Sequence, residues 1–277
     1  MQTKYLTVFS IMLMYAATMI EPACGQTGAT NKLYQQMAPS EQAAFVGERV
    51  RAIARQMSAT EYDFTPAFEM EVQKFIDSYV RRIGNNRGDS PGKGDARFIF
   101  ERGQRVAPTV IPVFKANNIS PLMGLYIPLV ESEYRNESSP NSVGAIGMFQ
   151  FLPKTGQLYG LSTADLLDVE KSADAAARYL SDGLNKFRND PMKEALALLA
   201  YNRGASRTAA DLVLVITDEN KQCSICALTA ARGKLDENFQ NENVNYVPRF
   251  FAAAIIGENP QSFGLKMQPL LSYEVRR

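Results

Sequence analysis

Helical spacing of apolar residues runs through almost the whole chain and constrains its fold more than any other feature of the sequence. The segment SEQAAFVGERVRAIARQMSA repeats apolar residues at every third or fourth position, which is the spacing of one helix face. The segment TPAFEMEVQKFIDSYVRRIG does the same, with Thr65 predicted as N-cap, Pro66 as first helical residue and Gly84 as terminator. No segment of the sequence alternates as a strand would. The pattern predicts a mainly α fold.

More helical segments follow a loop rich in Gly, Pro and Asp, NNRGDSPGKGD. The first of them reads RFIFERGQRVAPTVIPVFKANN, and we expect Pro108 and Pro112 to interrupt it, because proline lacks the N–H donor of a helix interior. The others are SPLMGLYIPLVESE, SADAAARYLSDGLNKFRN, PMKEALALLAYNRG, SRTAADLVLVI and VPRFFAAAIIG. We expect an N-terminal helical segment packed onto a helical core that begins near Asn118.

The composition excludes several classes of active site. The 277 residues include no histidine, so a Ser-His-Asp triad, a Cys-His pair and a His-ligated zinc site are ruled out. An enzyme of this composition would shuttle protons near neutral pH with a carboxylate of tuned pKa. Thirty Lys and Arg against 29 Asp and Glu give a net charge of +1, which predicts no nucleic-acid partner.

The N-terminus reads as an export signal. Lys4 precedes an apolar run from Tyr5 to Ile20, and Ala23-Cys24-Gly25 fits a small-x-small cleavage pattern. We therefore expect a signal peptide over residues 1–25 and a periplasmic or secreted protein. Two alternatives stay open. One is an uncleaved membrane anchor, although a run of about 15 apolar residues is short of the about 20 that span a bilayer. The other is a lipid on Cys24, against which Glu21 stands where such signals carry an aliphatic residue.

Cys223 and Cys226 form the motif CSIC. In an oxidising compartment two cysteines this close predict a local disulfide, with free thiols as the alternative. A thioredoxin-like redox pair would need a βαβ context, which the flanking sequence does not offer. Two cysteines are too few for a metal centre, so we expect none.

Three acidic residues, Glu131, Glu133 and Glu137, follow the apolar run LMGLYIPLV. The first two are two positions apart, about 200° around a helix, so at most one of them can face a cleft. Spacing alone favours the solvated end of a helix for all three. It likewise favours an exposed helix position for Gln150, which stands alone among apolar residues.

A resemblance changes this interpretation. The stretch LVESEYRNESSPNSVGAIGMFQFLPKTGQLYGL, with ALLAYNRG downstream and YVPRF beyond it, resembles the lytic transglycosylase (SLT) domain of the goose-type lysozyme-like superfamily, nearest to its membrane-bound D-type group. That family carries an apolar helix ending in Glu-Ser, then G-x-x-Q-F-x-P, then A-Y-N-x-G, then Tyr-Val-Pro, and all four blocks occur here in order. The resemblance implies a lysozyme-like helical domain over residues 97–257, preceded by a helical segment over 26–96 and followed by a tail over 258–277.

The resemblance also implies an activity. The family cleaves the MurNAc-β-1,4-GlcNAc bond of peptidoglycan and leaves 1,6-anhydro-MurNAc ends, without a metal or organic cofactor. Most glycosidases need two carboxylates, whereas here Glu131 alone would act first as acid and then as base. We expect peptidoglycan glycan strands as the partner. A cell-wall or secretion-machinery partner stays open, and membrane contact is expected only through an uncleaved or lipidated N-terminal segment.

Five further residues match the family's motifs and are expected to bind the substrate or support Glu131. Ser132 follows the acid and is expected to fix the helix end, and Gln150 would hydrogen-bond the glycan. Tyr201 would orient the acid or the N-acetyl group, Asn202 would cap the helix before a glycine, and Tyr246 would lie near the acid. Taken singly, each would more often be a core or capping residue.

The sequence departs from the family in the loop SPNSV. Asn141 stands where the family has a serine that contacts the acid, so either Ser142 replaces that serine or the contact is lost. Phe149 stands where the nearest group has tryptophan. Two other functions therefore remain candidates. One is a non-catalytic peptidoglycan-binding or assembly protein on the same fold, and the other is a lysozyme-type hydrolase.

Overall fold

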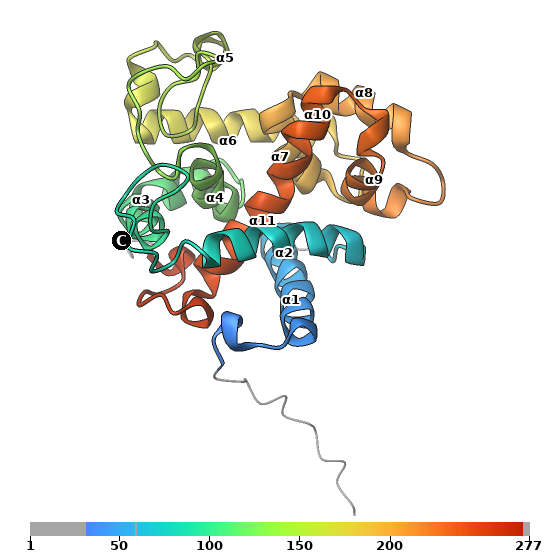
Figure 1. Cartoon of the computed structure of the whole chain (residues 1–277). Helices are drawn as coiled ribbons and strands as arrows, with labels where there is room; N and C mark the ends of the chain where they lie inside the picture. The colour runs from blue at the N-terminus through green and yellow to red at the C-terminus, as the bar shows by residue number, and fades with distance from the viewer. Residues whose placement is uncertain (1–31, 59, 274–277) are drawn as a thin grey trace, which may run out of the picture. The chain divides into compact units, whose positions relative to one another are not determined.

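The computed structural model describes residues 32–58 and 60–273. The predicted signal peptide over 1–25, with Cys24, lies outside the described residues. Lys32–Arg277 group as one compact unit, which is mainly α-helical as predicted (Figure 1). Its α-helices are α1 (Pro39–Ser58), α2 (Pro66–Val80), α3 (Arg97–Ala116), α4 (Pro121–Ser132), α5 (Pro153–Leu158), α6 (Val169–Lys186), α7 (Lys193–Arg203), α8 (Ala205–Val215), α9 (Ser224–Ala230), α10 (Glu237–Asn241) and α11 (Tyr246–Glu258). The described residues form no β-strand, only an isolated bridge between Ile146 and Phe151.

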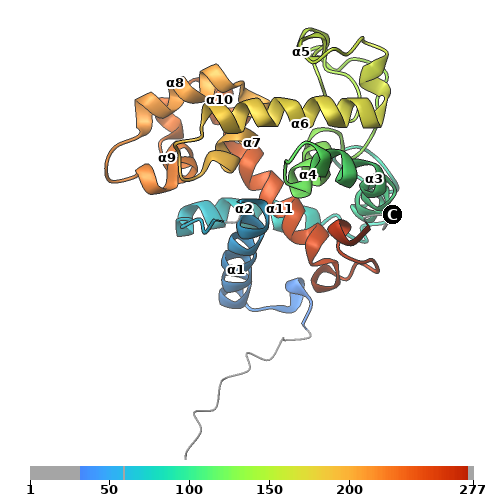
Figure 2. The same cartoon turned by 180° about the vertical axis from the view of Figure 1, so that it is seen from behind.

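Helices α4 and α11 form the centre of this unit. Every residue of α4 from Leu122 to Val130 is buried, and so is every residue of α11 from Tyr246 to Gly257 except Arg249. A helix that is apolar on all sides must be enclosed by other elements. Accordingly, α11 packs against α1, α2, α4 and α7, and α3 packs against α4 and α6, as Figures 1 and 2 show from opposite sides.

The prediction that proline interrupts the helix after Arg97 is wrong. Helix α3 runs without a break from Arg97 to Ala116, with Pro108 and Pro112 inside it. Both prolines are only partly buried, whereas Ile99, Gly103, Ala107 and their neighbours on the same face are buried in the core. Burial of that apolar face stabilises the helix despite the missing backbone hydrogen bonds, because tertiary packing outweighs local propensity.

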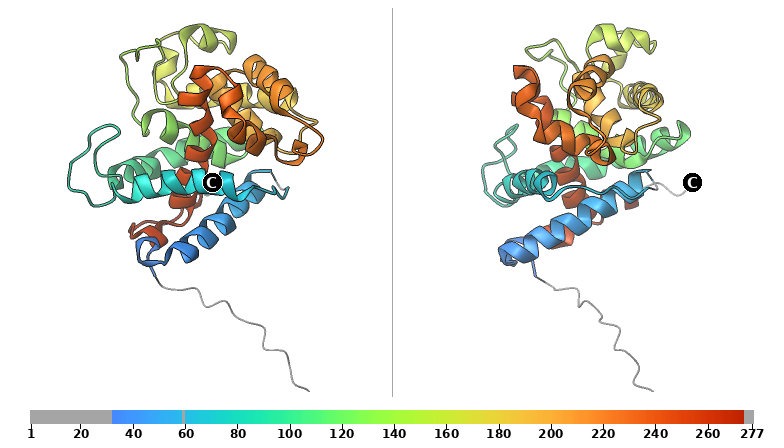
Figure 3. Two further views of the ribbon diagram at one scale, coloured as in Figure 1. Left: turned by 45° about the vertical axis from the view of Figure 1, so that its right-hand side comes forward. Right: turned by 90° about the vertical axis from the view of Figure 1, so that its right-hand side faces the viewer.

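The N-terminal helices share the core of the later ones. Helix α2 begins as predicted, with Thr65 as N-cap accepting a hydrogen bond from the backbone N–H of Phe68 at 3.3 Å and Pro66 as first helical residue. It lies against α11, and α1 also packs on both of these helices, as the views in Figure 3 show. The domain boundaries predicted at residues 97 and 257 stay predictions.

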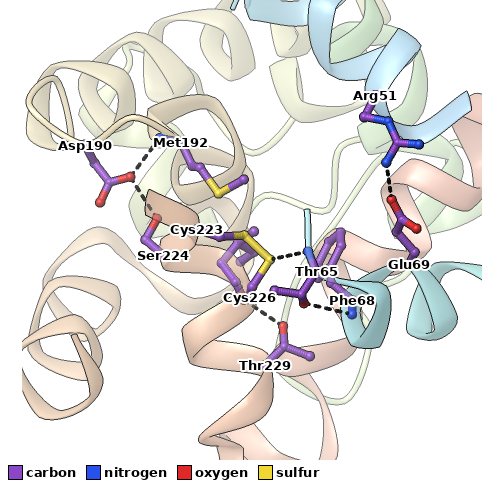
Figure 4. The surroundings of a disulfide bond; sticks show 11 residues. Arg51, Thr65, Phe68, Glu69, Asp190, Met192, Cys223, Ser224, Cys226 and Thr229 are labelled. Atoms are coloured by element: carbon purple, nitrogen blue, oxygen red, sulfur yellow. Dashed lines mark hydrogen bonds and ion pairs between the residues drawn. A yellow bond between two sulfur atoms is a disulfide. The ribbon is translucent and has the colours of Figure 1, made fainter. Parts of the chain in front are cut away.

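Cys223 and Cys226 are joined by a disulfide at the start of α9 (Figure 4). The backbone N–H of Thr65 lies 3.4 Å from the sulfur of Cys226. The hydroxyl of Ser224 donates to the carboxylate of Asp190 at 2.8 Å. These contacts connect α9 both to the beginning of α2 and to the turn before α7.

None of the helices in the described part of the chain is long and apolar enough to cross a membrane.

Candidate active site

Glu131 lies in the last turn of α4, and the backbone turns sharply directly after this helix. After Ser132 the backbone takes left-handed angles at Glu133 (φ 51°) and Tyr134 (φ 58°), which end the helix. The Tyr134 hydroxyl donates back to the carbonyl of Leu125 at 2.7 Å. Arg102 on α3 donates to the carbonyl of Glu133 at 2.8 Å. The position of Glu131 is therefore fixed by its own helix and by α3.

Glu131 is paired with Tyr246, the first residue of α11. The tyrosine hydroxyl donates to Oε1 of Glu131 at 2.7 Å, joining residues that are 115 positions apart. Glu131 keeps part of its surface exposed, but the surrounding protein removes most of its hydration. This desolvation raises the pKa of Glu131 to about 7, against the smaller opposing effects of the Tyr246 hydrogen bond and the positive charge of Arg249. Near neutral pH this carboxyl group is therefore poised between its acid and base forms.

Tyr201 belongs to the same electrostatic environment. Its hydroxyl donates to the carbonyl of Phe149 at 3.0 Å. Burial raises the pKa of Tyr201 well above its usual value, and the negative charge of Glu131 adds to that rise. The pKa of Tyr246 is raised by burial and then by the charges of Glu131 and Tyr201. Both tyrosines therefore remain protonated donors at any physiological pH.

The side chain of Ser132 hydrogen-bonds both within α4 and to the loop that follows it. Its Oγ lies 3.0 Å from the carbonyl oxygen of Pro128 and 2.8 Å from that of Met148. The backbone N–H of Met148 in turn donates to the side chain of Asn136 at 3.1 Å. Gly147, between these contacts, has a φ of 78° and packs so closely on the carbonyl of Leu166 that a Cβ would collide with it. The glycine of the G-x-x-Q block is thus required by backbone geometry.

Asn141 organises the loop in which the sequence departs from the family. Its side-chain oxygen accepts from the backbone N–H groups of Val143 at 2.9 Å and Ala145 at 3.0 Å, and its amide donates to Gln150 at 3.0 Å. Gln150 also donates to the carbonyl of Gly147 at 2.8 Å. The Ser142 side chain is exposed and has no partner among the described residues.

Neither Asn141 nor Ser142 hydrogen-bonds to Glu131 within residues 32–58 and 60–273. The serine contact that the resemblance implies is therefore made by neither residue, whereas Tyr246 donates the hydrogen bond to Glu131. Phe149, which stands where the nearest group has tryptophan, is buried and stacks on Phe114 with ring centroids 6.4 Å apart. It belongs to the core and offers no surface to a sugar.

Asn202 connects α7 to the chain that leads into α11. Its side-chain oxygen accepts from the amide of Asn243 at 2.6 Å. Asn243 also accepts from Arg203 at 3.2 Å, and the buried guanidinium of Arg203 pairs with Asp211 at 2.9 Å and Asp236 at 2.5 Å. This network fixes the residues directly before Tyr246. The helix cap expected of Asn202 is provided by Gly204, whose backbone N–H donates to the carbonyl of Ala200.

The prediction that Glu133 belongs to the solvated end of a helix is wrong. Glu133 pairs with Arg82 at 2.8 Å, and Arg135 pairs with Asp89 at 2.5 Å. Both partners come from the end of α2 or the loop that follows it. Sequence spacing could not find these pairs, since the partners lie about 50 positions apart. Glu137 is exposed as expected.

Arg249 is a site residue that sequence analysis missed. It follows Tyr246 by three positions on α11, so both side chains lie on one face of that helix. Its charge lowers the pKa of Glu131, and its guanidinium lies 5.6 Å from the ring centroid of Phe75. The sequence signal was an arginine one turn after the matched tyrosine, in the block YVPRF.

Within the described residues, no cluster of three or more Cys, Asp or Glu side chains is arranged to hold a metal ion. The chemistry available at the site is proton transfer by one carboxyl group of raised pKa, which accepts a hydrogen bond from protonated Tyr246.

Comparison of the sequence with known proteins identifies relatives of this chain. Residues 111–221 match the transglycosylase SLT domain family. Two proteins named membrane-bound lytic murein transglycosylase D, from Escherichia coli strains K12 and O6:H1, are each 28% identical to this chain over 155 residues. The aligned stretch covers 53% of this chain but only 30% of each relative's length. With the helical structure, the domain match confirms the predicted lysozyme-like α fold.

Proposed function

We propose that this chain, which belongs to the transglycosylase SLT family, is an exported peptidoglycan lytic transglycosylase that cleaves the MurNAc-β-1,4-GlcNAc bond with Glu131 as its acid and base. One observation carries the proposal. The carboxyl group of Glu131 is held by Tyr246 at 2.7 Å and has a pKa of about 7. A general acid works best when its pKa lies near the working pH, because the proton is then both present and easily given up.

In the first step, protonated Glu131 gives its proton to the glycosidic oxygen, so that the bond between this oxygen and the anomeric carbon of MurNAc breaks and GlcNAc leaves with a free 4-hydroxyl. The acetamido oxygen of MurNAc stabilises the anomeric carbon. In the second step, ionised Glu131 removes the proton of the MurNAc 6-hydroxyl, and the 6-oxygen bonds to the anomeric carbon. The product is a 1,6-anhydro ring, no water is consumed, and Glu131 regains its proton.

Tyr246 suits both steps. Its hydrogen bond favours the ionised carboxylate, which partly offsets desolvation and keeps the group able to act as acid and then as base. Tyr201, Ser132 and the pair formed by Asn141 and Gln150 hold the surrounding backbone. Among the carboxylates of the described residues, the only other one that raises the pKa of Glu131 is exposed Glu242, and it has the smallest effect. Catalysis by a single carboxylate agrees with this geometry.

The same proposal includes an N-terminal export signal and a catalytic domain that extends over residues 97–257. It also includes the glycan substrate and the 1,6-anhydro product. Both relatives are named for murein and for membrane binding. We propose export by the segment over residues 1–25. Retention at the membrane would follow from lipidation at Cys24 or from an uncleaved segment.

Mass spectrometry of peptidoglycan digested by the purified protein tests the proposal. Muropeptides 18 Da lighter than the hydrolysis products, with anhydro ends, are expected. Products with reducing ends would assign the chain to the lysozyme-type hydrolases. No soluble product, with glycan binding retained, would favour a non-catalytic binding protein.

A further inference from the structure

Two hollows in the surface meet beside the end of α4 that carries Glu131. The inner one, about 260 Å³, is lined in part by Val130 and Arg249. The outer one, about 580 Å³, lies between the end of α2 and the loop over residues 84–96. Three residues, Ser78, Arg82 and Gly92, line both. The two hollows therefore form one continuous depression, called the basic groove below.

The basic groove carries uncompensated positive charge. Arg81, Arg87 and Lys93 line its outer part, are exposed, and have no carboxylate partner among the described residues. None of the described residues that line the outer part is acidic. In the inner part, Glu133 is neutralised by Arg82 at 2.8 Å, while Arg249 lies against the ring of Phe75. A chain with a net charge of only +1 thus concentrates four unpaired cations along one groove.

The wall of the groove is built by specific contacts. Asp89, in the loop over residues 84–96, pairs with Arg102 at 2.6 Å and with Arg135 at 2.5 Å. The backbone N–H of Gly92 donates to Glu133 at 3.3 Å. These contacts attach the loop to α3 and to the residues just after Glu131. The loop that carries Arg87 and Lys93 is thereby attached close to the end of α4.

The inner end of the groove lies next to the last turn of α4, which carries Glu131. Val130, which lines it, directly precedes Glu131. Arg249, also in its lining, shares a helix face with Tyr246 and acts electrostatically on Glu131. A substrate held at Glu131 could therefore continue along the groove toward Arg81, Arg87 and Lys93.

We propose that the basic groove binds the carboxylate-bearing stem peptide of peptidoglycan, an inference that rests on the proposed function. The stem peptide is attached to the lactyl group of MurNAc, the sugar whose bond is cleaved. It therefore leaves the glycan next to Glu131, and its free carboxylates match arginine and lysine side chains. The outer groove belongs to the segment before residue 97, so this segment contributes substrate selectivity and the helical domain contributes the chemistry.

The test compares two variants of equal charge. One carries Arg81→Gln, Arg87→Gln and Lys93→Gln. The matched control carries Lys186→Gln, Arg188→Gln and Lys266→Gln, which removes three exposed charges that do not line the groove. Each set is placed in Glu131→Gln protein, and binding is measured to intact peptidoglycan fragments and to glycan strands whose stem peptides were removed by an amidase.

The groove variant should bind stem-bearing fragments about tenfold more weakly than the control, since three exposed charge contacts are lost. Binding to stripped strands should not differ. An equal loss on both ligands, no loss on either, or the same loss in the control would overturn the proposal. The binding comparison does not depend on turnover, so it tests the groove separately from the proposed function. If the proposed function is wrong, the wild-type protein will release no anhydro-muropeptides.

Discussion

The hydroxyl of Tyr246 donates to Oε1 of Glu131 at 2.7 Å, although 115 residues separate them in the chain. This bond connects the end of α4 to the start of α11, the two central helices. It joins two blocks of the family signature in space and lowers the pKa of the proposed catalyst, against the larger effect of desolvation. Several measurable consequences follow from it and from the elements that support it.

Replacing Tyr246 with phenylalanine removes a hydrogen bond that lowers the pKa of Glu131. The pKa should rise further above about 7, so the alkaline limb of kcat/KM, where the acid form is lost, should move to higher pH. We expect kcat to fall about tenfold because the carboxyl group loses its orientation. A pH–rate profile of Tyr246→Phe against Tyr273→Phe as control measures both effects. An unchanged alkaline limb would contradict the pairing.

Glu131 should make stability depend on pH. Its folded-state pKa is raised from 4.5 to about 7, so the folded protein binds the proton more tightly than the unfolded chain. Its contribution to stability is complete below pH 4.5 and is lost as pH rises through 7. A difference of about 2.5 units corresponds to about 3 kcal/mol.

The variant Glu131→Gln, which cannot ionise, isolates this contribution. It should match the wild type near pH 4 and be more stable by about 3 kcal/mol near pH 8, as chemical denaturation at the two pH values would reveal. Equal stability of the two proteins at pH 8 would show that the carboxylate is not desolvated.

Arg203 is predicted to position the start of α11. Replacing it with glutamine leaves the buried carboxylate of Asp211 without its partner, and we expect a loss of about 3–5 kcal/mol in unfolding free energy. Activity should also fall at temperatures where the variant is folded, because the residues before Tyr246 are released. Thermal denaturation and turnover of Arg203→Gln are compared with those of Arg207→Gln, an exposed arginine on α8. Similar values for both variants would argue against the network.

The disulfide between Cys223 and Cys226 should stabilise the fold without affecting catalysis. For a loop this short, chain entropy predicts about 2 kcal/mol. Replacing both cysteines with serine should lower the melting temperature by several degrees and leave kcat/KM within about twofold, since α9 contacts α2 and the turn before α7, away from Glu131. A large loss of turnover with unchanged stability would contradict this role.

Local patterns in the sequence were sufficient to predict the mainly α fold class, the start of α2 at Thr65 and the loop that follows α2. They failed at Pro108 and Pro112, because burial of one face of α3 stabilises a helix that local propensity would break. They also failed at Glu133, whose partner Arg82 comes from the turn after α2. Long-range pairs of this kind depend on packing, and no spacing within a segment reports them.

The site residues likewise divide into those that the sequence identified and those whose contacts only the structure shows. Motif order brought Glu131, Tyr201 and Tyr246 to attention, and the structure brings them into one electrostatic environment. Motif order suggested that Ser132 fixes the helix end, but it could not tell that Asn202 bonds to Asn243 or that Asn141 holds Gln150. Arg249 was missed because it matched no motif, although its spacing from Tyr246 places it on the same helix face.

The central claim is that the carboxyl group of Glu131 performs the bond cleavage. It is tested most directly by mass spectrometry of peptidoglycan incubated with wild-type protein, with Glu131→Gln, and with Glu137→Gln, which removes an exposed carboxylate six positions away. Wild type and Glu137→Gln should release 1,6-anhydro-muropeptides at similar rates, and Glu131→Gln should be slower by at least about a thousandfold. Release of anhydro products by Glu131→Gln at the wild-type rate would contradict the account.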